Sequence, residues 1–291
     1  MHSFVRVAEA GSFIAVANQL DVDRSVITRQ IAALERHLGA KLITRSTRSL
    51  QLTSAGQAYL ENCRTILGLV EAAESTLNAE RAIPRGRIRL GLPLTFGMQR
   101  LTPALLDFAR QYPQIELVMG LSDQRANLIE EGLDLSIRIT RDLKPTDVVR
   151  KLGQCRLLTL ASSTYLQRHA LPVHPRDLSQ HECLIYANDS PVTAWSYRAD
   201  GQSLQVTVRG RITANNGVVL MQAAALGMGI TLAPDFIAAP FLAQAQVQEI
   251  LTEFEDAPLG IYAVLPSNRY LPHRVSVLMD YLAEVLNTDR L

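Results

Sequence analysis

Residues 13–32 read FIAVANQLDVDRSVITRQIA, and they divide into two short helical patterns with a break at residues 20–22. Ser12 precedes the first pattern, where its hydroxyl can accept a hydrogen bond from a free backbone N–H. Asp23 can cap the second pattern in the same way. In both patterns apolar residues recur at helical spacing: Phe13, Val16, Ala17 and Leu20, then Ile27, Ile31, Leu34 and Leu38. The stretch therefore predicts two helices joined by a tight turn.

The second predicted helix has a polar face opposite its apolar one. That face carries only hydrogen-bonding groups and positive charge: Arg24, Ser25, Thr28 and Arg29. In a helix-turn-helix the second helix fits the major groove of DNA, where arginine reads guanine and short hydroxyls reach base edges or phosphates. The pattern favours DNA binding by these four residues. The alternative is a pair of surface helices, because the same geometry occurs outside DNA-binding proteins.

The stretch that follows favours the DNA-binding interpretation. Residues 42–52, LITRSTRSLQL, have a strand-turn-strand pattern with Arg45 and Arg48 at the turn. A basic hairpin directly after a recognition helix is typical of the wing of a winged helix. We therefore expect Arg45 and Arg48 to contact the phosphate backbone, which positions a protein on DNA without reading its sequence.

Four short motifs occur in order in the first 56 residues: A-x-x-G-S-F at 8–13, S-V-I-T-R-Q-I at 25–31, L-E-x-x-L-G at 34–39 and L-T-x-x-G at 52–56. In this order and spacing they resemble the LysR-type transcriptional regulators, and the likeness continues to about residue 286. One departure is Asp21, where the family often has glycine in the turn. The resemblance implies an α/β chain with an N-terminal winged helix-turn-helix, a long linker helix and a two-lobed periplasmic-binding-protein-like effector domain.

The resemblance also implies how the chain is divided. The winged helix-turn-helix is expected at 1–58, the dimerisation helix and hinge at 59–86, and the effector domain at 87–291. Within the effector domain, lobe I is expected to combine 87–160 with 266–291, and lobe II to span 161–265. The chain is thus expected to cross between the lobes near Ala161 and to return near Pro266.

The segment after Thr53 has the pattern of a dimerising helix. It contains no proline before Pro84, and its apolar residues fall on two interleaved seven-residue series: Leu60, Cys63, Leu67, Val70 and Leu77. Glu74 interrupts this seam at a core position. The alternative is a helix that packs on its own domain.

From residue 87 onward, strand and helix patterns alternate, as in mainly parallel sheets built from βαβ units. The expected strands are 88–92, 115–120, 133–139, 156–161, 183–186, 206–211, 230–233 and 260–265. The expected helices are 98–111, 125–131, 218–226 and 275–286. Two sheets are needed to place these strands.

Open α/β sheets bind ligands where strands end and helices begin. Thr95 lies at such a point, and Asn216 and Gly217 hold the equivalent place before the helix at 218–226. Ser122 and Arg138, at the ends of the next two strands, complete a predicted anion site, because free N–H groups at helix starts favour a carboxylate. The alternatives are that Thr95 is only a helix N-cap and that Arg138 is a solvated charge.

The charge distribution fits a DNA-binding head joined to a sensor. The 291 residues carry a net charge of +1. The first 60 residues hold seven basic and four acidic side chains, a net charge of +3, so the remainder carries −2. Because phosphate neutralisation supplies most nonspecific affinity for DNA, this small excess predicts weak binding by one copy and a need for dimerisation.

The sequence lacks the patterns that are typical of membrane proteins, metal-binding proteins and enzymes. No apolar run reaches about 18 residues and the N-terminus lacks a signal-peptide pattern, so we expect a cytoplasmic chain that does not enter membranes. Cys63, Cys155 and Cys183 lack metal-ligand spacing and are expected to be reduced thiols. Without a phosphate loop, a metal-spaced histidine pair or a nucleophile elbow, the sequence predicts no enzyme, no metal site and no cofactor.

The expected function is sequence-specific transcriptional regulation in response to a small anionic or polar effector. The expected partners are double-stranded DNA, the effector, a second copy in a homodimer or homotetramer, and RNA polymerase if the protein is an activator. Two alternatives remain open. One is a solute-binding protein that uses the two-lobed domain without gene regulation. The other is an architectural DNA-binding protein whose cleft is filled by side chains such as Phe96 or Trp195.

Overall fold

The computed structural model describes residues 1–20, 22–45, 50–78, 83–124, 128, 131–145, 147–187, 193–266 and 271–288. Asp21 and Arg48 lie outside these residues, as does most of the helix expected at 125–131. The chain divides into two compact units, Met1–Ile83 with Ser267–His273 and Pro84–Pro266 with Arg274–Leu291. In the part of the chain that the structure describes, no helix is long and apolar enough to cross a membrane.

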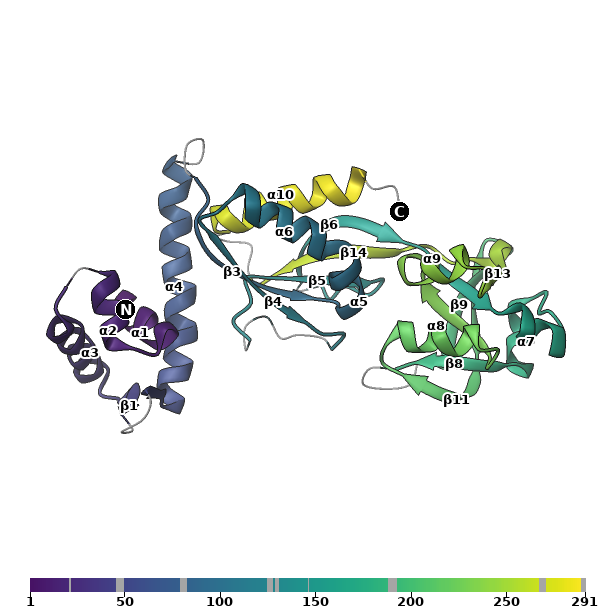
Figure 1. Ribbon diagram of the computed structural model, residues 1–291, viewed down its shortest axis with the longest axis horizontal. Coiled ribbons are helices and arrows are strands. Elements are labelled where there is room, and N and C mark those ends of the chain that lie inside the picture. The colour runs from purple at the N-terminus through teal and green to yellow at the C-terminus, as the bar shows by residue number, and fades with distance from the viewer. Residues whose placement is uncertain are drawn as a thin grey trace. The chain divides into compact units, whose positions relative to one another are not determined.

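The first unit follows the expected order of helices and wing. Its described elements are α1 (His2–Ala10), α2 (Phe13–Gln19), α3 (Arg24–Leu38), β1 (Ile43–Arg45), β2 (Leu50–Leu52) and α4 (Ser54–Asn78) (Figure 1). Both predicted caps are confirmed. Ser12 Oγ accepts a hydrogen bond from the Ala15 N–H at 3.2 Å. Asp23 Oδ1 accepts one from the Ser25 N–H at 2.7 Å. Helices α2 and α3 therefore form the helix-turn-helix that the sequence predicts.

One core holds these helices together. Its buried members are Phe4, Val5, Val7, Val16, Ala17, Ile27, Ile31, Leu42, Ile43, Leu60 and Cys63. Ile27 and Ile31 belong to the apolar face that the spacing predicts for α3, so that face is the buried one. The opposite face of α3 is thereby left toward solvent.

The exposed apolar side chains of helix α4 are not all those that the sequence assigns to the dimer seam. It begins at Ser54, and Thr53 Oγ1 caps it by accepting a hydrogen bond from the Gly56 N–H at 2.9 Å. Leu60 and Cys63 are buried in the core of their own unit, so their assignment to the dimer seam is wrong. The seven-residue spacing identifies an apolar stripe but does not identify what covers it, and here the core of the first unit, which includes Phe4, Val5 and Val7 of α1, covers Leu60 and Cys63.

Leu67 also packs against the core of the first unit, although it is only partly buried. Ile66 and Val70, by contrast, are 41% and 45% exposed. Because they are four residues apart, these two side chains lie on one face of α4. The side chains of Glu74 and Leu77 lie outside the described residues. The exposed apolar face of α4 therefore consists of Ile66 and Val70 in the described part of the helix.

The second unit is built on two five-stranded sheets. The first has the order β4-β3-β5-β14-β6, with β3 (Gly86–Leu92), β4 (Ile115–Leu121), β5 (Leu135–Thr140), β6 (Val148–Cys155) and β14 (Leu259–Leu265). The second has the order β11-β8-β12-β7-β13, with β7 (Leu157–Ala161), β8 (Glu182–Tyr186), β11 (Arg209–Ala214), β12 (Ile230–Pro234) and β13 (Gln248–Ile250). A separate hairpin joins β9 (Ala194–Ala199) to β10 (Gln202–Thr207).

These pairings correct the expected lobe limits. Strand β7 belongs to the second sheet, although the sequence places most of it in lobe I. Strand β14 belongs to the first sheet, although the sequence places it in lobe II, because it pairs antiparallel with both β5 and β6. The chain therefore crosses between sheets at Arg156 and returns between β13 and β14. Lobe I therefore contains the first sheet, and lobe II contains the second.

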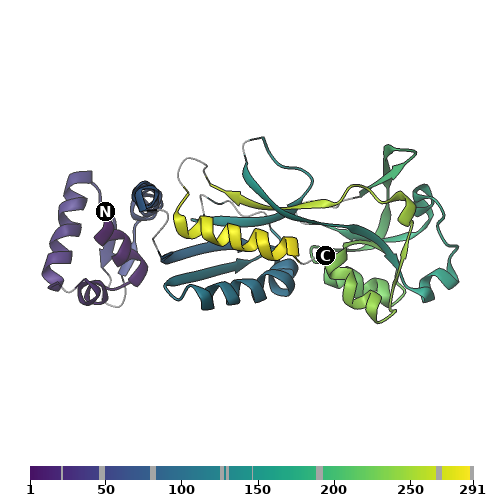
Figure 2. The same cartoon turned by 90° about the horizontal axis from the view of Figure 1, so that it is seen from above.

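Helices cover the two sheets. They are α5 (Leu94–Phe96), a π-helical turn (Gly97–Leu101), α6 (Thr102–Gln111), α7 (Ser163–Arg168), α8 (Gly217–Ala225), α9 (Asp235–Ala243) and α10 (His273–Thr288), with 3₁₀ turns at Pro175–Gln180 and Thr252–Phe254. Figure 2 shows α10 and α6 side by side on lobe I, where Tyr281 packs on Phe108 at 5.3 Å between ring centroids. The starts of α5 and α8 stand at the ends of β3 and β11, where the sequence predicts a ligand site.

Candidate functional site

The predicted DNA-reading residues lie on the solvent face of α3. Arg24, Ser25 and Arg29 are exposed and Thr28 is half-buried, whereas Ile27 between them is buried. The hydrogen bonds from Ser25 lower the pKa of the Asp23 carboxyl that caps the helix. The structure thus brings the four side chains together at the N-terminal half of one helix, the part that contacts base edges in helix-turn-helix proteins.

The wing is a two-stranded hairpin in which Ile43 pairs with Leu52 and Arg45 with Leu50. This confirms the two strands of the pattern at 42–52, and the residues between them lie outside the described part of the structure. Arg45 is the last residue of β1, and its side chain lies outside the described part of the structure, as does the whole of Arg48.

Glu35 of α3 holds the wing to that helix, a role that the sequence pattern does not predict. Its carboxylate is 8% exposed and accepts hydrogen bonds from the N–H groups of Leu42 at 2.9 Å and Ile43 at 3.1 Å, and from Lys41 Nζ at 2.6 Å. Burial opposes the charged form of Glu35, but these three hydrogen bonds outweigh it, so the pKa of the carboxyl lies below its usual value. The only signal for this role in the sequence is that Glu35 is the glutamate of the L-E-x-x-L-G motif at 34–39.

Helix α4 is tied to the helix-turn-helix by polar contacts as well as by the shared core. Arg64 pairs with Glu9 of α1 at 3.1 Å and with Glu61 of its own helix at 2.5 Å. Tyr59 packs on Phe4 with ring centroids 5.6 Å apart. A movement of α4 therefore carries α1 with it.

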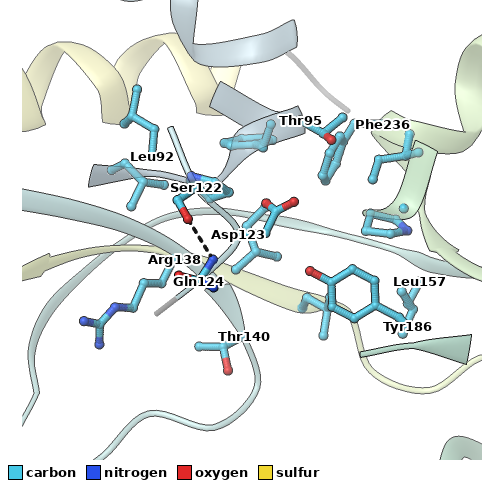
Figure 3. A pocket seen from close by; sticks show the side chains of 18 of the residues that line it. Leu92, Thr95, Ser122, Asp123, Gln124, Arg138, Thr140, Leu157, Tyr186 and Phe236 are labelled. Atoms are coloured by element: carbon cyan, nitrogen blue, oxygen red, sulfur yellow. Dashed lines mark hydrogen bonds between the residues drawn. The ribbon is translucent and has the colours of Figure 1, made fainter. Parts of the chain in front are cut away.

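A cavity of about 610 Å³ opens within the second unit, and residues of both lobes line it (Figure 3). Of the predicted effector residues, Thr95, Ser122, Arg138 and Gly217 line this cavity. Asn216 does not line it, but its Nδ2 donates a hydrogen bond to Thr95 Oγ1 at 3.4 Å. The two helix starts that the sequence singles out therefore meet across the lobes.

Thr95 is not the cap of its helix. The N-cap position belongs to Pro93, and the first N–H of the helix, that of Leu94, donates to Asp123 Oδ1 at 2.9 Å. Asn216 is the cap of α8, since its Oδ1 accepts from the N–H groups of Val218 and Val219. The interpretation of Thr95 as only a helix cap is therefore wrong, and Thr95 joins the lobes instead.

The two other predicted residues have partners near them. Ser122 is exposed, and its Oγ accepts a hydrogen bond from the Gln124 N–H at 3.1 Å. Arg138 pairs with Asp147 at 3.8 Å, and Figure 3 shows its guanidinium pointing away from Thr95 and Tyr186. The structure does not gather Ser122 and Arg138 around one point with Thr95.

Aromatic side chains form part of the cavity wall. Phe96 of lobe I meets Phe236 of lobe II edge to face, with ring centroids 5.0 Å apart. Trp195 of β9 lines the cavity and is 3% exposed. Phe96 and Trp195 thus form the wall without filling the space between the lobes.

Arginines brace the two segments where the chain crosses between lobes. Arg156 pairs with Glu249 at 3.2 Å and with Glu255 at 2.6 Å. Arg141, which lines the cavity, pairs with Asp256 at 3.1 Å and donates to the carbonyl oxygen of Ala257. The crossing segments are therefore linked to each other and to the cavity.

The cysteines are free thiols, and burial raises the pKa of both Cys155 and Cys183 to about 12. Such thiols are almost fully protonated near neutral pH and make poor nucleophiles. Among the described residues, no group of three or more His, Cys, Asp or Glu side chains could hold a metal ion.

Two family comparisons cover nearly the whole chain. Residues 1–57 match the bacterial regulatory helix-turn-helix protein, lysR family, and residues 81–287 match the LysR substrate binding domain. A transcriptional regulator from Xanthomonas campestris pv. campestris is 33% identical over 290 residues, which cover 98% of this chain and 84% of that protein. The regulator DmlR from Escherichia coli is 31% identical over 282 residues, 97% of this chain and 92% of that protein.

Two solved structures are similar over nearly the whole of this chain as well. CrgA, a LysR-type regulator from Neisseria meningitidis, is 30% identical with a TM-score of 0.62, over 98% of this chain and 97% of that one. AphB, a virulence activator of Vibrio cholerae, is 28% identical with a TM-score of 0.60, over 97% of each chain. The order of domains is thus the same along the whole length.

Proposed function

The chain belongs to the LysR family of bacterial transcriptional regulators, and from that premise we propose that α3 reads an operator, α4 pairs two copies, and a small polar effector binds in the cavity between the lobes. As a member of this family, the protein is a DNA-binding transcriptional regulator with an effector-binding domain. The proposal adds the residues that perform each task. It includes contact with RNA polymerase where the protein activates transcription, and assembly as a homodimer or homotetramer.

The cavity is the observation that supports an effector most directly. An architectural protein without a ligand would have its cleft filled by Phe96 or Trp195, but both side chains line an open space of about 610 Å³. The match of residues 1–57 to a helix-turn-helix family argues against a solute-binding protein without gene regulation. Effector binding favours one angle between the lobes, and in a dimer that angle would alter the spacing of the two recognition helices.

A gel-shift titration tests both halves of the proposal. The full-length protein is titrated onto the DNA upstream of its own gene, with and without a panel of small polar metabolites that includes acids, amines and alcohols. The proposal requires a specific shifted band and at least one metabolite that changes the apparent Kd. A protein that shifts no DNA contradicts the operator role, and a band insensitive to the whole panel contradicts the effector role.

Thr95→Val is expected to weaken the effector response and leave basal DNA binding intact. Valine keeps the shape of threonine but removes the hydroxyl, which accepts from Asn216 and is available to a ligand. Losing one hydrogen bond should raise the effector concentration for half response by about threefold to tenfold. The gel-shift titration measures it.

Thr231→Val is the matched control for this prediction. Thr231 is fully buried in β12 and does not line the cavity. The Thr231→Val protein should therefore respond to the effector at the same concentration as the unchanged protein. A Thr95→Val protein with an unaltered response would remove Thr95 from the site. Loss of basal DNA binding would point to misfolding.

Ile66→Asp is expected to weaken dimerisation by about tenfold or more, because it places a charge on the exposed apolar face of α4. Operator affinity should fall with it, since two linked half-sites gain from effective concentration. Sedimentation of the full-length protein measures the dimer constant. Leu171→Asp is the control, because Leu171 lies in lobe II and is 55% exposed, so the dimer constant should not change. Leu67→Asp should instead unfold the first unit, because Leu67 packs against its core. An unchanged dimer would mean that the copies associate elsewhere.

A further inference from the structure

The two lobes contribute different surfaces to the cavity, a mainly apolar one from lobe II and a more polar one from lobe I. We infer that the effector is amphiphilic: its polar head hydrogen-bonds to lobe I at Thr95, and its apolar body, a ring or a hydrocarbon chain, packs against lobe II. The inference rests on the proposed function, namely that an effector occupies this cavity, and it adds the chemical class and the orientation of that effector.

The surface of lobe II at the cavity is an apolar wall. Its larger apolar side chains there are Leu157, Leu184, Trp195, Leu232, Phe236 and Ile237. In the part of lobe II that the structure describes, the polar side chains at the cavity are those of Tyr186 and Ser196, and none is charged. A polar ligand group that faced this wall would lose hydrogen bonds to water and gain few in return, whereas a hydrocarbon group is stabilised there.

The surface of lobe I carries more polar groups. The uncharged ones are Thr95, Ser122, Gln124, Ser136 and Thr140, and the charged ones among the described residues are Asp123, Glu131, Arg138 and Arg141. Figure 3 shows Ser122 and Arg138 on the left of the cavity, and Leu157, Tyr186 and Phe236 on the right. The polar part of a ligand therefore has its partners in lobe I.

Thr95 lies where the polar side of the cavity meets the apolar wall. The ring of the next residue, Phe96, meets that of Phe236 in lobe II with centroids 5.0 Å apart. Thr95 Oγ1 accepts a hydrogen bond from Asn216 Nδ2 at 3.4 Å, and a threonine hydroxyl that accepts can also donate its own hydrogen. A ligand oxygen that accepts this hydrogen lies beside Phe236, so the body attached to it can extend along the wall of lobe II.

The size of the cavity allows a body of several carbons. Its volume of about 610 Å³ is typical of sites for small organic ligands. Each methylene group that leaves water for an apolar wall should tighten binding by about fourfold. The length of the apolar body therefore decides the affinity more than the head does.

A series of straight-chain alcohols tests this inference, because its members share one head and differ in the body: 1-butanol, 1-hexanol and 1-octanol. Trp195 is the only tryptophan in the sequence and lines the cavity, so its fluorescence reports occupancy in the full-length protein. Each step of two methylenes should lower the Kd by about tenfold to twentyfold. The diol 1,8-octanediol should bind at least about tenfold more weakly than 1-octanol, because its second hydroxyl is buried against the wall.

Two variants separate the head from the body. Thr95→Val should raise the Kd of every alcohol by the same factor, about threefold to tenfold, and keep the dependence on chain length. Leu157→Asn places an amide in the half-buried part of the wall, so it should reduce the gain of 1-octanol over 1-butanol by about threefold or more. Leu226→Asn is the matched control, because Leu226 is 76% exposed in lobe II and does not line the cavity. It should change neither the Kd values nor their dependence on length.

Any one of four results would overturn the inference: a Kd that is independent of chain length, 1,8-octanediol that binds as tightly as 1-octanol, a length dependence that Leu157→Asn leaves intact, or Kd values that Thr95→Val leaves unchanged. None of them would by itself contradict the proposed function, which fails only if the gel shift shows no DNA binding or no response to any metabolite. Fluorescence therefore tests the class of the effector, and DNA binding tests its role.

Discussion

Replacing Glu35 by Ala is expected to destabilise the wing by about 2 to 6 kcal/mol and to abolish high-affinity DNA binding. The change leaves the buried N–H groups of Leu42 and Ile43 without their acceptor, and each unsatisfied buried donor costs about 1 to 3 kcal/mol. Hydrogen exchange of these two amides in the full-length protein measures the loss directly, since protection reports the free energy of local opening.

Lys41→Ala separates the ion pair from the backbone hydrogen bonds. The side chain of Lys41 is 77% exposed, so its pair with Glu35 should contribute less than about 1 kcal/mol. This variant should therefore keep protection at Leu42 and Ile43. Equal loss of protection in both variants would show that the ion pair with Lys41, and not the two backbone hydrogen bonds, holds the wing.

The same carboxylate predicts a dependence on pH. Because folding lowers the pKa of Glu35, its contribution is complete above the unfolded value of about 4.5 and is lost as the pH falls through the folded value. Wing protection in the unchanged protein should therefore decline on acidification below about pH 4.5. In Glu35→Gln, which cannot lose a charge, the wing should be weaker at neutral pH and this step should be absent.

Arg29→Ala is expected to reduce operator affinity by about 1 to 3 kcal/mol if Arg29 reads a base, and by less if it touches only phosphate. Arg29 is exposed on the polar face of α3, next to the half-buried Thr28. Binding measured over a range of salt concentrations distinguishes the two roles. Loss of a phosphate contact lowers the salt slope by about one unit, whereas loss of base readout relaxes specificity.

Arg110→Ala provides a charge-matched control for this experiment. Arg110 is 82% exposed in α6 of the second unit, so its removal takes one positive charge away from the protein without touching α3. Affinity, specificity and salt slope should all stay unchanged. If Arg29→Ala behaves like this control, the assignment of α3 as the recognition helix is wrong.

Local signals allowed the N-terminal elements to be predicted from the sequence. A cap such as Ser12 or Asp23 and the apolar spacing of α3 act within a turn or two of helix, so a short stretch contains all the information. The sheets are different, because membership depends on distant partners. Ile261 of β14 pairs with Ile139 of β5, and nothing near residue 261 encodes that pairing. Helix α9 is absent from the expected helices, and it contains Pro240, a residue that disfavours the interior of a helix.

The candidate sites divide in the same way. Thr95 and Gly217 were located because the change from strand to helix is visible in the sequence around them. The hydrogen bond from the Leu94 N–H to Asp123 was missed because the two residues lie far apart along the chain. Arg138 was predicted as an anion ligand from its place at the end of a strand, because the sequence pattern does not show its contact with Asp147, which directly precedes β6.

The burial of α4 in the head of the protein has a consequence for building hybrid regulators. Leu60 and Cys63 complete the core of the first unit, and Arg64 ties the helix to Glu9. A fusion joined near residue 58 would remove these side chains from the first unit and expose its core to water. A fusion made after Asn78 keeps the head whole, so the same operator could be placed under the control of a sensor from another regulator.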